Sequence, residues 1–90
     1  MIGDIIKVQR LNLAYTDVNL TNDSKIDKTA TITIPSGYKV LDYYIRNWAG
    51  VTQVSILSLS ETTLTIRAWN NTGATQSNVY IYVGILYTKI

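Results

Sequence analysis

The sequence predicts an all-β domain: an antiparallel β-sandwich, jelly-roll-like, with about seven or eight short strands and no significant helix. Apolar and polar residues alternate along several segments, polar turn clusters separate these segments, and no useful length of chain has helical periodicity. The chain has 90 residues without a linker or an internal repeat. We therefore expect one domain over residues 1–90.

The first predicted strand covers residues 6–15. Its apolar side chains stand at even positions up to Val8 and at odd positions from Leu11 onward. One extra residue in a strand would absorb such a change of phase. We therefore expect a β-bulge near Gln9 and Arg10.

A weak alternation continues at Val18 and Leu20, before a polar turn cluster at residues 21–25. The next predicted strand covers residues 29–34, where threonines alternate with apolar residues. It ends at the Pro-Ser-Gly sequence of residues 35–37, because Pro sets the φ angle of a turn and Gly permits a positive φ.

The second half of the chain holds four further predicted strands, at residues 40–48, 54–59, 64–69 and 79–87. In the first of them, Leu41, Tyr43 and Ile45 form the apolar face that we expect to point into the core. The Asn-Asn-Thr-Gly sequence at residues 70–73 is a strong turn signal. The last strand is apolar on both faces, which is expected of a central strand or of one covered by another subunit.

The charge pattern excludes several classes of partner. Charged residues make up 16% of the chain, below the roughly 25% of a typical soluble domain. The 8 basic residues are scattered and exceed the 6 acidic ones by two, so we expect no nucleic-acid binding. No apolar stretch reaches the length of a membrane span, and residues 1–4 lack the features of a signal peptide.

The absence of His and Cys excludes most catalytic chemistry. A Ser-His-Asp triad, a Cys nucleophile, a disulfide and a zinc or iron–sulfur site on these residues are all impossible. A glycosidase would need two facing carboxylates, for which Asp42 and Glu61 are the remote candidates. We expect the protein to be no enzyme and to need no cofactor.

A calcium site is the remaining metal hypothesis, because one segment is rich in oxygen donors: Asp17, Asn19, Asn22, Asp23 and Asp27. The spacing of these residues does not match an EF-hand loop, which also needs a glycine at its sixth position. We expect an ordinary polar connection there and no bound metal.

The aromatic residues carry the most information about function. The chain has 7 Tyr and 2 Trp but no Phe, which suggests rings at wet or shared surfaces rather than in a dry core. By alternation, Tyr44, Arg46 and Trp48 share one outward face, Arg67 and Trp69 share another, and Tyr80 and Tyr82 line the second face of the last strand. These seven residues are the ligand or interface candidates.

Three interpretations of the candidates stay open. The tryptophans could cap the edges of the core, anchor a subunit interface, or act as platforms for sugar rings. Gly84 stands in line with Tyr80 and Tyr82, where glycine commonly marks a bulge or a close approach to the backbone, either by a symmetry mate or by a sandwich partner within the chain.

Residues 29–90 also resemble a known family. The resemblance rests on residues 32–38 (ITIPSGY), the strand from Val40 to Trp48, the turn at residues 70–73 and the closing segment VYIYVGILYTK of residues 79–89. These segments resemble the C-terminal domains of tail-fibre and baseplate proteins from phages of Gram-positive bacteria.

The resemblance implies a compact β-sandwich in a virion, or otherwise outside the cell. It implies a homotrimer in contact with other virion proteins that recognises a saccharide of the host cell wall. It transfers no site residue to this chain. A tumour-necrosis-factor-like jelly roll is a neighbouring possibility, for which 90 residues is short. The alternative function is a monomeric carbohydrate-binding module with Trp48 and Trp69 as stacking platforms.

Overall fold

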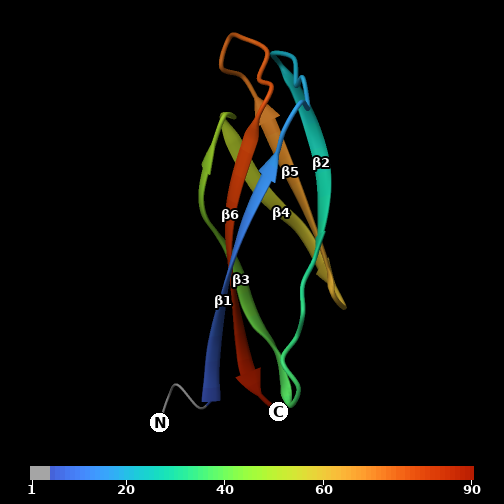
Figure 1. Cartoon of the computed structure of the whole chain (residues 1–90), viewed down its shortest axis with the longest axis vertical. Coiled ribbons are helices and arrows are strands. Elements are labelled where there is room, and N and C mark those ends of the chain that lie inside the picture. The colour runs from blue at the N-terminus through green and yellow to red at the C-terminus, as the bar shows by residue number, and fades with distance from the viewer. Residues whose placement is uncertain (1–4) are drawn as a thin grey trace.

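The protein consists of two antiparallel sheets of three strands each (Figure 1). The structure, a computed structural model, describes residues 5–90, so the start of the chain, where no signal peptide is expected, lies outside the described residues. The strands are β1 (Ile6–Tyr15), β2 (Ser24–Thr31), β3 (Tyr38–Ala49), β4 (Gln53–Ser60), β5 (Thr63–Asn70) and β6 (Val79–Lys89). Their order is β1-β6-β3 in one sheet and β2-β5-β4 in the other.

The all-β prediction is confirmed, but the predicted number of strands is too high, since residues 5–90 form six. The weak alternation after β1 yields only an isolated bridge between Leu20 and Gln76. Asp17 and Asn19 have positive φ angles of 55° and 48°, which interrupt extended backbone on either side of Val18.

The strand predicted at residues 29–34 lies earlier in the chain, as β2. It begins at Ser24 and pairs with β5 over its whole length. Lys28 occupies a position of β2 that points between the sheets, so a charged residue interrupts the apolar alternation there. This explains why sequence patterning placed the strand too late.

The core lies between the two sheets and is centred on β5 and β6, the middle strands. Alternate residues of both strands are buried, as the alternation predicted. The buried apolar residues are Leu64, Ile66 and Ala68 of β5, Val79, Ile81, Val83, Ile85 and Tyr87 of β6, and Leu20, Ile32, Val51 and Val54.

The bulge predicted in β1 is absent. The strand pairs with β6 without interruption, from Ile6 opposite Thr88 to Tyr15 opposite Val79. Val8 therefore points away from the core and is 55% exposed. Gln9 can point inward because its Oε1 accepts a hydrogen bond of 2.5 Å from the Tyr87 hydroxyl. The strand can therefore stay regular, because the inward-pointing polar side chain has a hydrogen-bond partner inside the fold.

Two bulges occur instead in β3, between Val40 and Asp42 and between Ile45 and Asn47. Each shifts the phase of the strand by one residue. Leu41 is the extra residue of the first bulge and is 55% exposed, so its predicted place in the core is wrong.

The molecule is long and narrow, with extents of 47 × 22 × 17 Å. Figure 1 shows that the β1-β6-β3 sheet is strongly twisted. At the lower end of the view in Figure 1, β1 lies to the left of β6 and β3 to its right, and at the upper end the two strands have changed places. The side of this sheet that points away from the core is therefore a twisted surface and not a flat one.

Candidate functional site

The candidate site is the face of the β1-β6-β3 sheet that points away from the core, which we call the outer face. On β6 this face carries Tyr80, Tyr82, Gly84, Leu86 and Thr88, which alternate with the buried residues. Strand pairing arranges the outer face in five rows across the sheet: Ile6–Thr88–Lys39, Val8–Leu86–Asp42, Arg10–Gly84–Tyr44, Asn12–Tyr82–Asn47 and Ala14–Tyr80–Ala49.

The close approach at Gly84 is made by Tyr44 of the neighbouring strand in the same sheet, rather than by a symmetry mate or by the facing sheet. A Cβ atom added at Gly84 would lie 2.4 Å from Cζ and 2.6 Å from the hydroxyl oxygen of Tyr44. The phenol ring therefore occupies the space above Gly84, an arrangement by which aromatic residues stabilise glycine in sheets. Tyr44 remains 41% exposed and contributes a ring to the outer face.

Arg46 crosses all three strands of the sheet. Its Nε donates to the Val83 carbonyl oxygen at 3.2 Å, and its Nη2 donates to Asn12 Oδ1 at 2.7 Å. Its guanidinium carbon lies 5.8 Å from the centre of the Tyr82 ring, within cation–π range. Arg46 thus connects β3 to β1 over β6, and these contacts use much of its capacity to bind a ligand.

An apolar patch occupies the two rows beside this connection. It consists of Val8, Leu86 and Tyr44 in these rows, together with Leu41 on the adjoining bulge of β3, and all of them but Leu86 are exposed by more than a third. One charged residue of each sign stands at its borders, Arg10 on β1 and Asp42 on β3. Sequence patterning missed this patch, although the apolar residue at an even position, Val8, was its visible signal.

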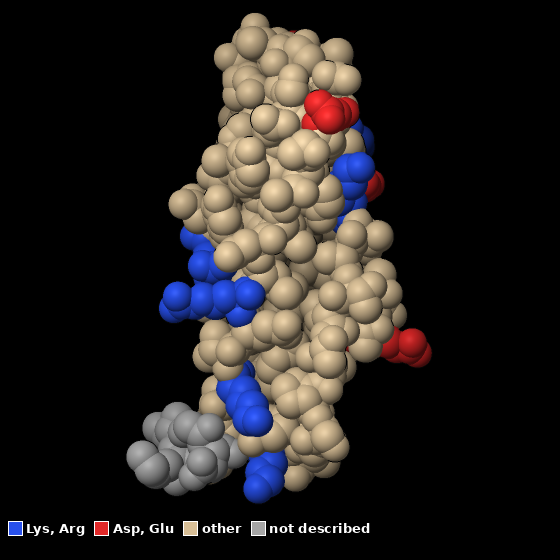
Figure 2. Space-filling view, viewed as in Figure 1, with Lys and Arg blue, Asp and Glu red and all other residues tan. Residues whose placement is uncertain are grey.

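Charged side chains are sparse on the molecule. In the view of Figure 2, acidic side chains lie only along one flank, whereas basic ones lie on both flanks and at the lower end. Most of the visible surface between them is uncharged. Such a surface presents little like-charge repulsion to another protein.

Arg67 and Trp69 lie on the other sheet, on the outward side of β5. Arg67 Nε and Nη2 donate to Asp27 Oδ1 and Oδ2 at 2.7 and 2.9 Å. The guanidinium that donates these hydrogen bonds lowers the pKa of Asp27 below its ordinary value, and Asp27 raises the pKa of Arg67 in turn. Arg67 also lies 5.8 Å from the centre of the Trp69 ring.

Trp48 lies neither on the outer face nor beside Arg67 and Trp69. Because the second bulge of β3 lies between Tyr44 and Trp48, Trp48 pairs with Ile81, a buried residue, rather than continuing the face of Tyr44. The predicted common face of Tyr44, Arg46 and Trp48 is therefore wrong for Trp48. Trp48 and Trp69 lie on different sheets, so the register does not join them into one platform.

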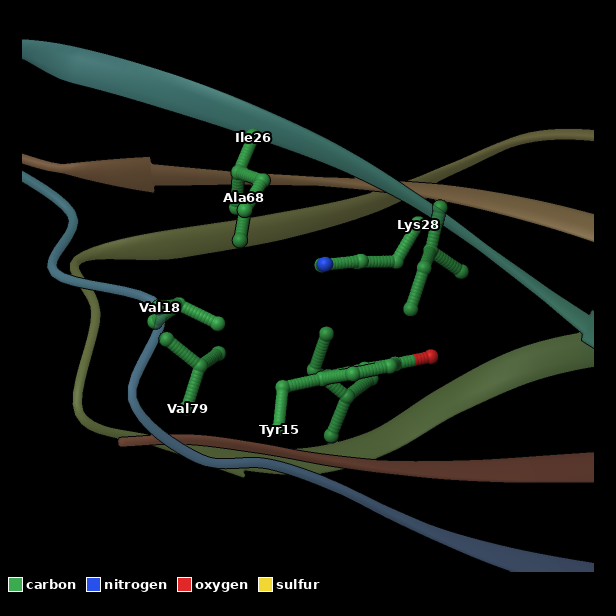
Figure 3. A pocket seen from close by; sticks show the side chains of 8 residues that line it. Tyr15, Val18, Ile26, Lys28, Ala68 and Val79 are labelled. Atoms are coloured by element: carbon green, nitrogen blue, oxygen red, sulfur yellow. The ribbon is translucent and has the colours of Figure 1, made fainter. Parts of the chain in front are cut away.

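Figure 3 shows a gap between the sheets with Lys28 pointing into it above the ring of Tyr15. The other side chains that line the gap are apolar: Val18, Ile26, Ile66, Ala68, Val79 and Ile81. The gap is too narrow to admit a water molecule. Lys28 Nζ lies 5.6 Å from the centre of the Tyr15 ring, and burial raises the pKa of Tyr15.

The positions of the acidic residues do not support the hypotheses of a calcium site or of a pair of catalytic carboxylates. Within residues 5–90 no three acidic residues gather where they could hold a metal ion. In the oxygen-rich segment, Asp27 is paired with Arg67. Asp42 lies on β3, and Glu61 lies in the turn between β4 and β5 of the other sheet. The described part of the chain also contains no helix long and apolar enough to cross a membrane.

Comparison with known proteins adds no relative. No family model matches the chain, and neither curated proteins nor solved structures give a match. The outer face therefore has to be interpreted from its own geometry.

Proposed function

We propose that the chain is a non-enzymatic assembly domain, a jelly-roll-like β-sandwich that forms a homotrimer as part of a phage virion. In this proposal the outer face is the surface by which copies associate. The observation that carries it is the double-sided β6, whose inner residues form the core while its outer residues lie beside exposed Val8 and Tyr44. Tyrosines and arginines of this kind are typical of interface hot spots.

The free edges of the sheets support association through a face rather than through added strands. Edge strands β1 and β2 carry the inward-pointing lysines Lys7 and Lys28, each above a tyrosine ring. Edge strand β3 has two bulges, and β4 has one between Ile56 and Ser58. Inward charges and bulges both hinder pairing with another edge.

The virion setting and the recognition of a host cell-wall saccharide rest on the resemblance of residues 29–90. The alternative, a monomeric carbohydrate-binding module, would have to use Trp48 and Trp69 as separate platforms, and Arg67 lies above the second ring. We therefore rank assembly above saccharide binding as the function that the geometry supports.

Sedimentation velocity and light scattering at micromolar concentrations test the assembly. We expect the mass of a trimer, and a strictly monomeric protein would overturn the proposal. Val8→Glu should weaken association, because it buries a carboxylate in the patch. Leu57→Glu, at an exposed apolar position on β4, is the matched control and should leave the mass unchanged.

Titration with cell-wall saccharides, followed by tryptophan fluorescence, tests the alternative. A saturable change in the wild type that Trp48→Ala or Trp69→Ala removes, in a protein that stays monomeric, would favour the carbohydrate-binding module. Loss of assembly in these variants without any loss of saccharide binding would exclude the platform role.

A further inference from the structure

We infer that the partner of the outer face is a second copy of this chain, related by a symmetry axis parallel to β6, so that Arg10 of one copy pairs with Asp42 of the next. The inference rests on the proposed assembly and adds to it the orientation of the partner. Its basis is the position of the two charges on the sheet.

The two charges stand on opposite edges of the same face. Arg10 lies on β1 in the row of Gly84, and Asp42 lies on β3 in the adjacent row of Leu86. Both side chains are exposed. Among residues 5–90, neither makes an ion pair within the chain, and the Asp42 carboxylate accepts only the hydrogen bond from the Tyr43 backbone nitrogen, at 2.8 Å.

The balance of charge on the outer face leaves Arg10 without an acidic neighbour among the described residues of its own copy. The five rows and the bulge carry the cations Arg10, Lys39 and Arg46, against Asp42 as the acid. Arg46 is already bound to Asn12 and the Val83 carbonyl oxygen. Two such faces placed together would bring cations against cations, unless the acid of each copy meets a free cation of the other.

The direction of the symmetry axis decides whether this happens. An axis parallel to β6 places β1 of one copy opposite β3 of the other, which brings Arg10 toward Asp42. An axis along the rows places β1 opposite β1 and β3 opposite β3, so that Arg10 of one copy lies across the sheet from Asp42 of the other and the two cannot pair. Adjacent rows are two residues apart, about 7 Å along the strand, which an arginine side chain can span.

The apolar patch supplies the rest of the contact. Val8, Leu86 and Tyr44 lie in the same two rows as the charges, and Leu41 precedes Asp42 on the bulge, so the ion pair would form at the border of an apolar contact. A pair that is partly removed from water is screened less by salt than an exposed one. In a dimer, a two-fold axis along the strands would form this ion pair twice. In a trimer, a three-fold axis along the strands would bring the β1 edge of each copy to the β3 edge of the next and form it once per interface.

Charge reversal with rescue tests this arrangement. The association constant is measured by sedimentation velocity for the wild type, Arg10→Glu, Asp42→Lys and the double variant. We expect each single reversal to weaken association about tenfold or more, because it places like charges in contact. The double variant should return to within about threefold of the wild type. Lys25→Glu and Glu61→Lys, outside the outer face, are the controls and should have no effect.

The outcomes separate the two proposals. A wild type that associates, with single variants that do not weaken it or a double variant that is not rescued, would overturn the arrangement and leave the assembly standing. A wild type that stays monomeric at every concentration would overturn both. Circular dichroism of each variant shows that it is folded before its mass is interpreted.

Discussion

Asn70 connects three parts of the chain at the end of β5. It is 1% exposed, and its Nδ2 donates to the carbonyl oxygens of Leu20 and Ala74, both at 2.8 Å. Its Oδ1 accepts from the backbone nitrogen and the hydroxyl of Thr72, at 3.0 and 2.7 Å. All hydrogen-bonding groups of the amide are therefore used inside the fold.

Asn70→Ala should lower the free energy of unfolding by about 3 kcal/mol, because it removes the four hydrogen bonds of a buried amide at once. Asn70→Asp should also destabilise the protein, since it places a second side-chain oxygen against the carbonyl oxygens of Leu20 and Ala74. Urea denaturation measures both changes. Asn71→Ala, at the exposed neighbour, is the control, and an equal effect there would contradict the explanation.

The ion pair of Asp27 and Arg67 predicts a dependence of stability on pH. The folded pKa of Asp27 lies below its unfolded value of about 3.9. The contribution of the pair is therefore present above that pH and is lost as pH falls through the lower, folded pKa. The stability difference between wild type and Asp27→Asn should shrink over this acidic range. A constant difference in the denaturation midpoint would contradict the assignment.

At the scale of the elements, two glycines with close neighbours differ in what a methyl group would displace. At Gly50, φ is +89° and an added Cβ would lie 2.3 Å from the Asn78 backbone oxygen. At Gly84 the added atom would meet the ring of Tyr44, which is the end of a side chain that is partly exposed to solvent. The first neighbour cannot move without the backbone, whereas the second can rotate away.

Gly50→Ala should therefore destabilise the fold by more than about 2 kcal/mol, and Gly84→Ala by about 1 kcal/mol or less. Gly84→Ala should instead weaken association, because the Tyr44 ring leaves its place on the outer face. Thermal denaturation and sedimentation measure the two effects. Equal loss of stability in both variants would show that Tyr44 cannot move.

Sequence patterning predicted the strands whose pairing is regular. β5 and β6 have no internal bulge of their own, so alternation correctly separated Leu64 and Ile66 from Arg67, and the inward residues of β6 from Tyr80 and Tyr82. In β3 the alternation failed, because bulges depend on the register with β6 and leave no mark in the strand itself. This is why Tyr80 and Tyr82 were placed correctly and Trp48 was not.

The ends of β1 and β2 show a second limit. The inward positions of Lys7, Gln9 and Lys28 are acceptable because Tyr38, Tyr87 and Tyr15 supply a ring or a hydroxyl from elsewhere in the chain. Such partners are between about 10 and 80 residues apart in sequence, and no local pattern reveals them. The outward position of Val8, and with it the apolar patch, could not be predicted for the same reason.

At the scale of the whole molecule, the two sheets form a thin body. A chain of 90 residues with extents of 47 × 22 × 17 Å has a small core for its surface. Covering the outer face in an assembly would add buried apolar area that the single chain lacks. The thermal midpoint should therefore rise with protein concentration, as measured by calorimetry over a dilution series. A midpoint that is independent of concentration would contradict coupled assembly.

The order of the strands has a consequence for how the protein is made. Of the six strands, β6 is synthesised last, yet it lies between β1 and β3 and is their common partner in the sheet. During translation the backbone of these two strands has no partner in the sheet until residues 79–89 emerge. Folding of this sheet is thus delayed until β6 has been synthesised, and contacts far apart in sequence make it slow. A chain that is truncated before β6 would therefore be unfolded and prone to aggregate, and would not form a smaller folded domain.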